Sequence, residues 1–581
     1  MGDNIQSVND IDYTPIRNVH PSPADWRDVF IYFLLVDRFD NNSKGTKPYT
    51  SSSKIQEPDI SEGKKFQGGN IKGIIRRLDY IKGLGANAIW LSPVFRNRQE
   101  MEDSYHGYGI QDFLRVDERF GNLEDLQELV KEAHSRDMYV ILDIIINHTG
   151  DNWAYPGDYP YYYWKDAPGP FDFGNWRTSL GASDSNNGIG ENDAVWPLEL
   201  QSPDCYKRRG QITDWNDTDQ AVNGDFFTLK ELDVRRSDVL DTLIKAYKYW
   251  IKEADIDGFR MDTVKHLESG STAIFCNAIR EYAKSIGKHN FFIFGEIVGD
   301  DTTIQKYIGR NSRIPGTHER FPSLDAALDF PLYFVLEEVI KGFSDPSVLR
   351  NRYDAFRNLY TDHGEAGRYF VTFVDNHDQM TRPYRRFMHG NNIWQQAVLA
   401  MAYLLTSQGI PCIYYGTEQG FDGGGEDDAY IRECMFGGNW GAFGAKGYHF
   451  FNQDNPIYCD ISRIANIRME EPALRYGRQY FRQVSAGTVT GSTFSYPTNG
   501  NCTLAYSRIL DTTEILVAMN LGSVPRKDYV IVDSNLHRAG GNMVDLLDHE
   551  KEYLIGHSGS AMFVKIPLQP YSIAILKEKT G

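Results

Sequence analysis

The chain has 581 residues, too many for one compact domain, and 41% of them are hydrophobic, which is enough for a large core. Its formal net charge of −18 repels nucleic acid and anionic lipid, and no Lys/Arg block marks a basic patch, so neither a nucleic acid nor a membrane is an expected partner. The six cysteines form no Cys-x-x-Cys pair, so a zinc or redox motif has no support.

Strands and helices alternate along the first part of the chain, after a polar lead-in. Apolar runs predict buried strands at 29–36, 86–91 and 139–145. Apolar residues at helical spacing predict a helix over 71–83 and a second one that begins after Asn122, a residue suited to cap it. This alternation predicts a parallel sheet with right-handed crossovers.

The alternation stops after His148. Residues 149–228 are rich in Gly, Asp, Asn, Tyr, Trp and Pro. A structureless loop of that length is implausible in a compact domain, so the segment is predicted to be a small inserted domain on the third strand–helix connection. Most of its aromatic side chains are expected to pack a core of their own rather than to line a cleft; examples are Trp153, Tyr155, Tyr159, Tyr161 and Trp164.

Alternation then resumes with a helix predicted over 239–251. Further strands are predicted to end at residues 262 and 296, to lie near 326–330, to end at 375, and to span 410–415. The total of eight strands predicts an α/β fold in which the sheet closes into a (β/α)8 TIM barrel. From about residue 478, short alternating strands separated by turn residues predict a small antiparallel β-sandwich.

These patterns predict four parts of the chain. They are a lead-in at 1–27, the barrel at 28–148 and 229–477, the insert at 149–228, and the C-terminal sandwich at 478–581.

Charged and polar residues follow four of the predicted strands, in the segments 143–148, 258–262, 295–296 and 375–378. Parallel strands bring their carboxyl ends to one edge of a barrel, where (β/α)8 enzymes keep their active site. Asp262, Glu296 and Asp378 would be the three carboxylates of that site. Any one of them could instead be a barrel-end salt bridge, but the convergence of four strands argues against this for the set.

Asp262 and Glu296 end adjacent strands, which lie about 5 Å apart. Their carboxylates can therefore face each other at roughly 5–5.5 Å, the separation of a retaining glycoside hydrolase. Arg260 shares a strand face with Asp262 and is expected to keep it ionised, as a nucleophile requires. Glu296 follows an apolar run, so its pKa is expected to be raised, which suits a general acid.

Two histidines, His148 and His377, also follow strand ends. A lone histidine is often structural, but at this edge both are expected to hydrogen-bond substrate hydroxyls. Asp378 is expected to bind the 2- and 3-hydroxyls of the sugar and to help distort it, because such bonds strengthen in the transition state.

The same segments resemble the conserved regions of the α-amylase family, glycoside hydrolase family 13. The segments 143–148, 258–266, 295–296 and 373–378 occur in family order and at family-like spacing, and 37–39, 105–108 with Asp112, and 229–233 also fit. The resemblance covers roughly residues 28 to 580. It implies a retaining α-glucan enzyme with Asp262 as nucleophile, Glu296 as general acid/base and Asp378 as transition-state stabiliser.

The resemblance also implies the substrate-binding residues. Tyr108 matches the ring that stacks on the sugar, His106 matches a hydroxyl ligand, and Arg260, His148 and His377 match partners of substrate and carboxylates, while Asp112 belongs to the matching loop. Lys265 and His266 match a pair common in α-amylases on the aglycone side, which favours an endo-acting amylase. Gly109 stands where many α-amylases have Trp, and this would reshape the cleft.

Calcium is the ion that the resemblance implies, and oxygen donors suit it. The family ligands match Asn147, Asp233 and the backbone of His266, and Asp204 and Glu199 are candidates for a further acidic ligand from the insert. A second candidate site is the loop 37–42 with residues 69–70, although ordinary loop chemistry explains its polar residues equally well.

The first functional hypothesis is therefore an endo-acting α-amylase that hydrolyses α-1,4-glucans such as starch and maltodextrin. A transglycosylase, a cyclodextrin-degrading enzyme or a debranching enzyme on the same frame is the alternative, because the catalytic residues do not encode whether water or a sugar hydroxyl completes the reaction. A silent glucan-binding protein is a third hypothesis, opposed by the intact carboxylate set. A monomer is expected. No secretion leader or transmembrane run is visible, so a cytoplasmic protein and a mature secreted form both fit.

Overall fold

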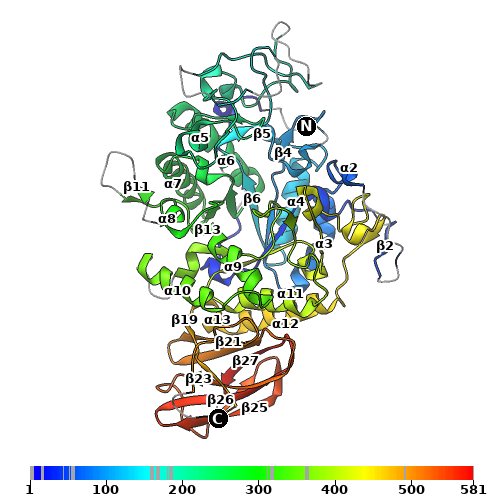
Figure 1. Cartoon of the computed structure of the whole chain (residues 1–581). Coiled ribbons are helices and arrows are strands. Elements are labelled where there is room, and N and C mark those ends of the chain that lie inside the picture. The colour runs from blue at the N-terminus through cyan, green and yellow to red at the C-terminus, as the bar shows by residue number, and fades with distance from the viewer. Residues whose placement is uncertain are drawn as a thin grey trace.

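The computed structural model describes residues 5–14, 19–43, 45–50, 53, 59–101, 103–157, 162–164, 170–179, 181, 188–309, 312–313, 320–359, 366–487, 489 and 493–579. A barrel forms the centre of the molecule, and an antiparallel C-terminal sheet lies at one end of it (Figure 1). The segment that connects β7 (His148–Thr149) to β8 (Lys230–Glu231) projects at the opposite end (Figure 1).

Eight parallel strands close the barrel in the order β1-β16-β14-β13-β10-β9-β6-β3, which confirms the predicted TIM barrel. Their bounds are β1 Ile31–Leu34, β3 Ala88–Leu91, β6 Tyr139–Ile144, β9 Gly258–Met261, β10 Phe292–Gly295, β13 Ala326–Leu328, β14 Phe370–Thr372 and β16 Ile410–Tyr414. Every residue of these strands except Tyr139 is buried, as expected for a parallel sheet that is covered by helices.

Helices surround the barrel. Helix α3 (Ile71–Gly83) has the predicted bounds, and α4 (Leu123–His134) begins after the predicted cap Asn122, whose side chain forms a capping box with Asp125. The other long helices are α6 Ser237–Ala254, α7 Ser269–Ser285, α9 Phe330–Ile340, α10 Ser347–Leu359, α11 Trp394–Thr406 and α12 Pro456–Glu470. Short helices are α1 Val36–Phe39, α2 Ile60–Gly63, α5 Thr218–Asn223, α8 Asp301–Ile304 and α13 Pro472–Tyr476.

The first barrel strand is shorter than its apolar run predicts. The backbone N–H of Val36 donates to Ser92 Oγ at 3.1 Å instead of joining the ladder, and the buried Asp37 carboxylate accepts backbone N–H bonds from the neighbouring loop. The chain therefore leaves the sheet after Leu34 and turns into α1. The run stays apolar because α1 is as buried as the strand.

Aromatic side chains of the segment 149–228 pack on one another. Trp153 stacks on Phe173 with ring centroids 4.4 Å apart, and Tyr155 stacks on Tyr162 at 4.6 Å. These contacts fit the expected core of the insert, whereas Tyr159 and Tyr161 lie outside the described residues.

The C-terminal sheet has nine antiparallel strands in the order β19-β21-β22-β27-β24-β25-β26-β23-β20. Their bounds are β19 Arg478–Phe481, β20 Val484–Ala486, β21 Thr503–Leu510, β22 Thr513–Asn520, β23 Arg526–Val532, β24 Asn542–Asp545, β25 Asp548–Ser558, β26 Ala561–Leu568 and β27 Ile573–Glu578. On β22, Leu516 and Ala518 enter a core shared with β23 and β26, and the alternate residues Val517 and Met519 join the barrel core. Both faces of this strand are therefore buried.

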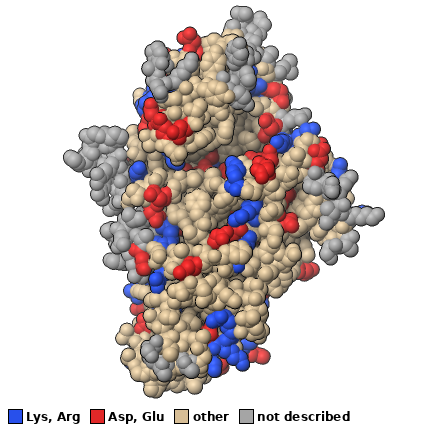
Figure 2. All heavy atoms as spheres, viewed as in Figure 1, with Lys and Arg blue, Asp and Glu red and all other residues tan. Residues whose placement is uncertain are grey.

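Short two-stranded ribbons complete the structure. They pair β2 Lys47–Pro48 with β18 Tyr448–His449, β4 Phe95–Asn97 with β5 Ile110–Val116, β7 with β8, β11 Ser312–Arg313 with β12 Arg320–Phe321, and β15 Tyr384–Arg385 with β17 Gly424–Gly425. On the face shown in Figure 2, acidic and basic side chains are interspersed. Within the described ranges, no helix is long and apolar enough to cross a membrane.

Strand register places the predicted carboxylates at one edge. Asp143 on β6 and Arg260 on β9 are Cα partners, and Met261 on β9 is the partner of Gly295 on β10. Asp262 and Glu296 therefore leave adjacent strands at the same level. We call this carboxyl end of the barrel the catalytic edge.

Candidate active site

The side chain of Arg260 lies at the centre of the catalytic edge and is fully buried. Its Nη1 lies 2.7 Å from Asp262 Oδ1 and 2.8 Å from Asp143 Oδ1, and its Nη2 lies 2.9 Å from Glu296 Oε2. One guanidinium thus links carboxylates from three neighbouring strands, and the contact with Glu296 adds to the predicted one with Asp262.

Asp262 and Glu296 have shifted acidities. Burial raises the pKa of Asp262 to about 7, against the opposing effect of Arg260. Burial likewise raises the pKa of Glu296 to about 7, with Arg260 opposing and the Asp262 and Asp378 charges adding to the rise. The predicted rise for Glu296 agrees with this direction. For Asp262 the guanidinium does not outweigh burial, so the two carboxyl groups behave as an interacting pair that holds a proton near neutral pH.

Within the described residues, Asp262 and Glu296 each present one carboxylate oxygen without a protein hydrogen-bond partner. The hydrogen bonds of Asp262 reach Oδ1, and those of Glu296 reach Oε2, which also accepts the backbone N–H of Thr263 at 3.1 Å. Among the described residues, no hydrogen bond reaches Asp262 Oδ2 or Glu296 Oε1. These two oxygens are available to a substrate.

Asp378 lies in the loop after β14. Arg432 Nη2 donates to its Oδ1 at 2.8 Å, and His377 Nε2 lies 3.0 Å from its Oδ2. Burial would raise the pKa of this carboxyl, but His377 and the two guanidinium groups of Arg432 and Arg260 outweigh burial and hold the pKa well below its usual range. Asp378 is therefore ionised at any working pH.

Tyr108 joins the two sides of this cluster. Its Oη donates to Asp143 Oδ2 at 2.9 Å and lies 2.8 Å from His377 Nε2, and its ring stacks on His377 with centroids 5.4 Å apart. Half-buried His106 stacks on the same ring at 5.6 Å, and burial lowers the pKa of His106 to about 3. His106, Tyr108 and His377 thus lie together and form one hydrogen-bonding wall of the site.

His148, Lys265 and His266 lie on the side of the cluster that faces the insert. Lys265 and His266 occupy the short 3₁₀ turn Val264–His266, which begins two residues after Asp262. Burial lowers the pKa of His148 to about 3 and that of His266 to about 4, so both rings are neutral.

An aromatic group from the insert covers these two histidines. Phe226 stacks on His148 at 6.1 Å and meets the edge of His266 at 5.1 Å. Beside it, Trp215 and Phe227 are 38% and 57% exposed, with ring centroids 5.6 Å apart. We call Trp215 and Phe227 the aromatic platform. The sequence interpretation did not single these residues out, and the adjacent pair 226–227 at the end of the insert was their only signal.

Asp112 is not part of the cluster. It is buried on β5, accepts the backbone N–H of Leu114 at 2.9 Å, and has a pKa raised by burial to about 6. This hydrogen bond is local, and the described contacts of Asp112 give no geometric support for its predicted role in substrate binding.

Two residues that hold the catalytic edge together were given no role by the sequence. Asp143 contacts Arg260, Tyr108 and Trp90 Nε1, and burial raises its pKa to about 6. Its signal was its place in the segment 143–148. Arg432 follows the short 3₁₀ turn Asp428–Ile431 and reaches Asp378 from a distant part of the chain, so local sequence gives no indication of it.

Two of the predicted calcium ligands, Asn147 and Asp233, have side-chain contacts with other protein groups. Asn147 Oδ1 is buried without a partner, but Asn147 Nδ2 donates to Glu231 Oε2 at 2.7 Å, and the ammonium of Lys207 lies 3.4 Å from Glu231 Oε1. Asp233 is paired with Arg235 at 2.7 Å. Calcium takes six to eight oxygens, and one free amide oxygen beside a buried ammonium does not fit it. Calcium here stays a prediction that the donor set does not support.

The other candidate oxygens are also engaged. Glu199 accepts a hydrogen bond from the backbone N–H of Val8, and Asp204 is exposed beside Arg208. In the second candidate loop, Asp37 pairs with Arg38 at 2.9 Å, and Asp40 pairs with Arg77. Across the described ranges, no group of three or more His, Cys, Asp or Glu side chains is arranged to hold a metal ion.

Known proteins are similar to this chain in sequence and in fold. The chain is 32% identical to a β/α-amylase of Paenibacillus polymyxa over 81% of its own length, and it spans 33% of that longer relative. The crystal structure of an α-amylase from Geobacillus thermoleovorans, complexed with acarbose, is 28% identical with a TM-score of 0.68, and covers 96% of this chain and 100% of that one. A cyclomaltodextrin glucanotransferase with a three-domain ABC distribution is 26% identical with a TM-score of 0.69, and has the same coverage.

The family model described as "Alpha amylase, catalytic domain" matches residues 33–436. This range includes all of the catalytic edge and every barrel strand, apart from the first two residues of β1. The chain belongs to the α-amylase family of glycoside hydrolases.

Proposed function

We propose that the protein is an endo-acting, retaining α-amylase that hydrolyses α-1,4-glucosidic bonds of starch and maltooligosaccharides. The observation that carries this proposal is the bridging of Asp262 and Glu296 by the two terminal nitrogens of Arg260. A single guanidinium confines the two carboxylates to a short separation, which favours the retaining geometry of about 5–5.5 Å over the wider inverting one.

In the first step, Asp262 Oδ2 attacks the anomeric carbon while Glu296 Oε1 protonates the glycosidic oxygen. The carbon–oxygen bond to the aglycone breaks, its electron pair leaves with the oxygen, and a covalent glycosyl–Asp262 ester forms. In this step the nucleophile Asp262 must be ionised while the general acid Glu296 is protonated. A pair that shares one proton near neutral pH suits this requirement.

In the second step, the Glu296 carboxylate takes a proton from water, and the hydroxide oxygen attacks the anomeric carbon and releases Asp262. The configuration is inverted twice and so retained. Asp378 stays ionised beside the reacting ring and can stabilise positive charge in the transition state, while Arg260 remains bound to both carboxylates throughout. No step in this sequence passes through a metal ion.

The assignment to endo-acting hydrolysis rests on Lys265 and His266, the pair that lies beyond Asp262 where an aglycone chain would leave. One observation favours a second candidate, a transglycosylase. The exposed aromatic platform lies beside His266 and offers a surface on which an acceptor sugar could stack and displace water. Amylases and a glucanotransferase are both similar to this chain.

A time course on maltoheptaose and soluble starch tests the proposal, with products separated by size and their anomeric form read by NMR. Early α-configured maltooligosaccharides with rapid loss of iodine staining are expected. Glu296→Gln should abolish turnover, while Glu550→Gln, an exposed surface glutamate, should not change it. β-Configured first products would exclude the retaining mechanism, and products longer than the substrate as the main species would favour the transglycosylase.

A further inference from the structure

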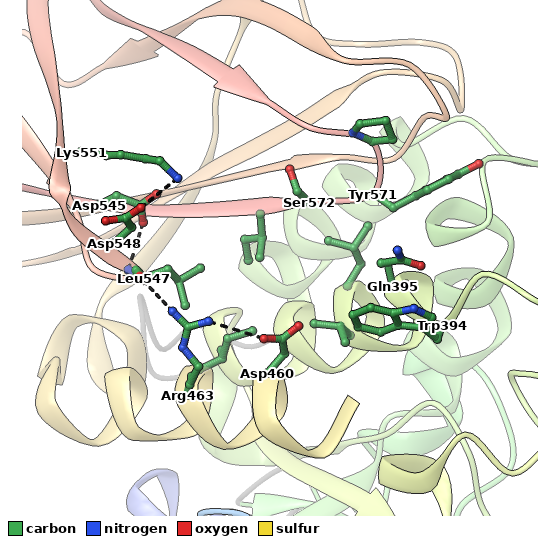
Figure 3. Close-up of a pocket in the computed structure, with 15 residues that line it drawn as sticks. Trp394, Gln395, Asp460, Arg463, Asp545, Leu547, Asp548, Lys551, Tyr571 and Ser572 are labelled. Atoms are coloured by element: carbon green, nitrogen blue, oxygen red, sulfur yellow. Dashed lines mark hydrogen bonds and ion pairs between the residues drawn. The ribbon is translucent and has the colours of Figure 1, made fainter. Parts of the chain in front are cut away.

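A cavity of about 590 Å³ lies between the barrel helices α11 and α12 and the C-terminal sheet (Figure 3). Its volume is in the range of about 300–1,000 Å³ that is typical of small-molecule sites. The lining residues come from α11, α12, the hairpin of β24 and β25, and β27 with the turn before it, and none of them belongs to the catalytic edge. The cavity is therefore a separate feature of the molecule.

Two aromatic side chains occupy one end of this cavity. Trp394, the first residue of α11, and Tyr571, in the turn before β27, lie together with Gln395 (Figure 3). All three are half-buried. In the described part of the chain, no hydrogen bond is made by Trp394 Nε1, Tyr571 Oη or the Gln395 amide, so their polar ends are available at the mouth.

Tyr571 is held in an unusual backbone conformation. Its φ of 51° lies in the left-handed region, which glycine and asparagine adopt far more readily than a residue with a large side chain. The strain is on the order of 1 kcal/mol, and stability alone would favour a different residue. The ring is nevertheless placed here, beside Trp394 (Figure 3).

The opposite end of the cavity is polar and is lined by two cations, Arg463 and Lys551, and three carboxylates, Asp460, Asp545 and Asp548. Arg463 on α12 lies 3.6 Å from Asp460 and donates to the backbone carbonyl of Leu547 at 2.7 Å. Lys551 lies 3.0 Å from Asp548. Each cation already has a carboxylate partner, and the third carboxylate, Asp545, accepts backbone N–H bonds from Leu547 and Ile575. The cavity therefore offers hydrogen-bonding groups that are already held in place.

We propose that this cavity binds a segment of α-glucan chain outside the active site. A pyranose ring has apolar C–H faces, which suit the rings of Trp394 and Tyr571, and an equator of hydroxyls, which suits the amide, carboxylates and guanidinium around them. Three buried apolar side chains, Val398, Leu399 and Ile464, form its floor. A neutral, hydroxyl-rich ligand matches this lining better than an ion or a lipid.

The choice of an α-glucan rests on the proposed function, because the active site would act on the same polymer. A second site on the same rigid frame raises the effective concentration of chain near the catalytic edge, provided that one polymer reaches both. The chain that leaves Asp378 passes through the short strand β15 and then enters α11, which begins with Trp394. The benefit is therefore expected for starch and not for short oligosaccharides that fill the active site alone.

The test uses the full chain with Glu296→Gln, which retains the frame without turnover, in native gels that contain soluble starch or barley β-glucan. Tyr571→Asn removes the ring and suits the backbone conformation, and Trp394→Ala removes the second ring. Phe343→Ala is the matched control, because Phe343 is 75% exposed and does not line the cavity. The same substitutions are also placed in the active enzyme for kinetics on maltotetraose and starch.

We expect Tyr571→Asn and Trp394→Ala each to weaken retention by starch about fivefold or more, and Phe343→Ala to leave it unchanged. In the active enzyme, KM for starch should rise and kcat/KM for maltotetraose should stay constant. Unchanged retention in both cavity variants would overturn the proposal, as would equal retention by β-glucan. If the enzyme cleaves maltotetraose but the cavity variants bind starch as the parent does, the cavity proposal fails and the proposed function stands. If the enzyme cleaves neither maltotetraose nor starch, the proposed function itself fails.

Discussion

Asp143 and Arg260 face each other across the β6–β9 strand pair, with Arg260 Nη1 2.8 Å and 3.0 Å from the two carboxylate oxygens. Because the same nitrogen also contacts Asp262 Oδ1, Asp143 competes with the proposed nucleophile for the guanidinium. Asp143 therefore acts on the reaction through Arg260, as a positioning residue.

Substitution of Asp143 should change the pH dependence of activity. Burial raises the pKa of Asp262, and the Asp143 charge raises it further. Asp143→Asn removes that charge and leaves Arg260 freer to stabilise ionised Asp262, so the pKa of Asp262 should fall. The acidic limb of the kcat/KM profile should move to lower pH, while kcat falls about 10- to 100-fold because Arg260 is less well held. An acidic limb that does not shift would show that Asp143 has a merely structural role. The control is Asp528→Asn, at a buried carboxyl of the C-terminal sheet that does not line the cavity.

Substitution of Glu296 should stabilise the fold at high pH. Burial raises the pKa of this group from 4.5 to about 7, so its contribution is fully present below about pH 4.5 and is lost as pH rises through 7. Glu296→Gln stays neutral and avoids this loss. We expect its free energy of unfolding to exceed the parent's by about 1–3 kcal/mol above pH 7, with the gain vanishing below pH 4.5.

Urea unfolding at pH 4.5, 6 and 8 measures this difference. The exposed Glu550→Gln variant should track the parent at each pH. A stability gain that is the same at pH 4.5 and 8 would mean that the effect does not arise from ionisation of Glu296.

Removal of calcium should leave the parent protein unaffected. The buried Lys207 ammonium already supplies a positive charge beside Glu231, so we expect chelation by EDTA to shift Tm by no more than about 1 °C. Lys207→Met removes that charge and leaves the Glu231 carboxylate with Asn147, and should lower stability by about 3–5 kcal/mol. Added calcium is expected to restore part of this loss in the variant alone.

Thermal melts with and without EDTA, together with metal content measured by mass spectrometry, decide this point. One tightly bound calcium per parent chain, with a large loss of Tm on chelation, would restore the calcium site that the family resemblance implies.

The aromatic platform should control how much of the product comes from transfer. Trp215 and Phe227 are exposed beside His266, where an acceptor sugar would stack. Trp215→Ala and Phe227→Ala should reduce products longer than a maltoheptaose substrate by about three- to tenfold and change hydrolysis less. Product sizes at matched conversion measure the ratio, with Phe334→Ala, an exposed aromatic of α9, as control. If transfer and hydrolysis fell by the same factor, the platform would bind the donor substrate as well as the acceptor and would not control transfer.

The sequence predicts the barrel well because its information is local. The barrel strands are short runs of three to six residues, most of them apolar, and Asp262 and Glu296 directly follow β9 and β10. The contacts that tune these carboxylates are not local. Arg432 reaches Asp378 across 54 positions of the chain, and Arg260 reaches Glu296 only because β9 and β10 are neighbours in register.

The same reason explains why the ion prediction lacks support. Asn147 lies where an oxygen donor was expected, but the charge beside it comes from Lys207, whose position depends on how the insert folds back onto the barrel. Acidic residues such as Asp233 look free in a sequence and are paired with a neighbouring arginine in the structure.

The closure of the barrel by β1 and β16 also bears on how the chain is made. Ile31 pairs with Cys412, so the first strand to leave the ribosome has no partner on that side until most of the protein has been synthesised. Until then its hydrogen-bonding edge is open to neighbouring nascent chains, and a contact of such long range forms slowly. Aggregation of truncated or stalled chains, and relief of that aggregation by chaperones, would follow from this topology.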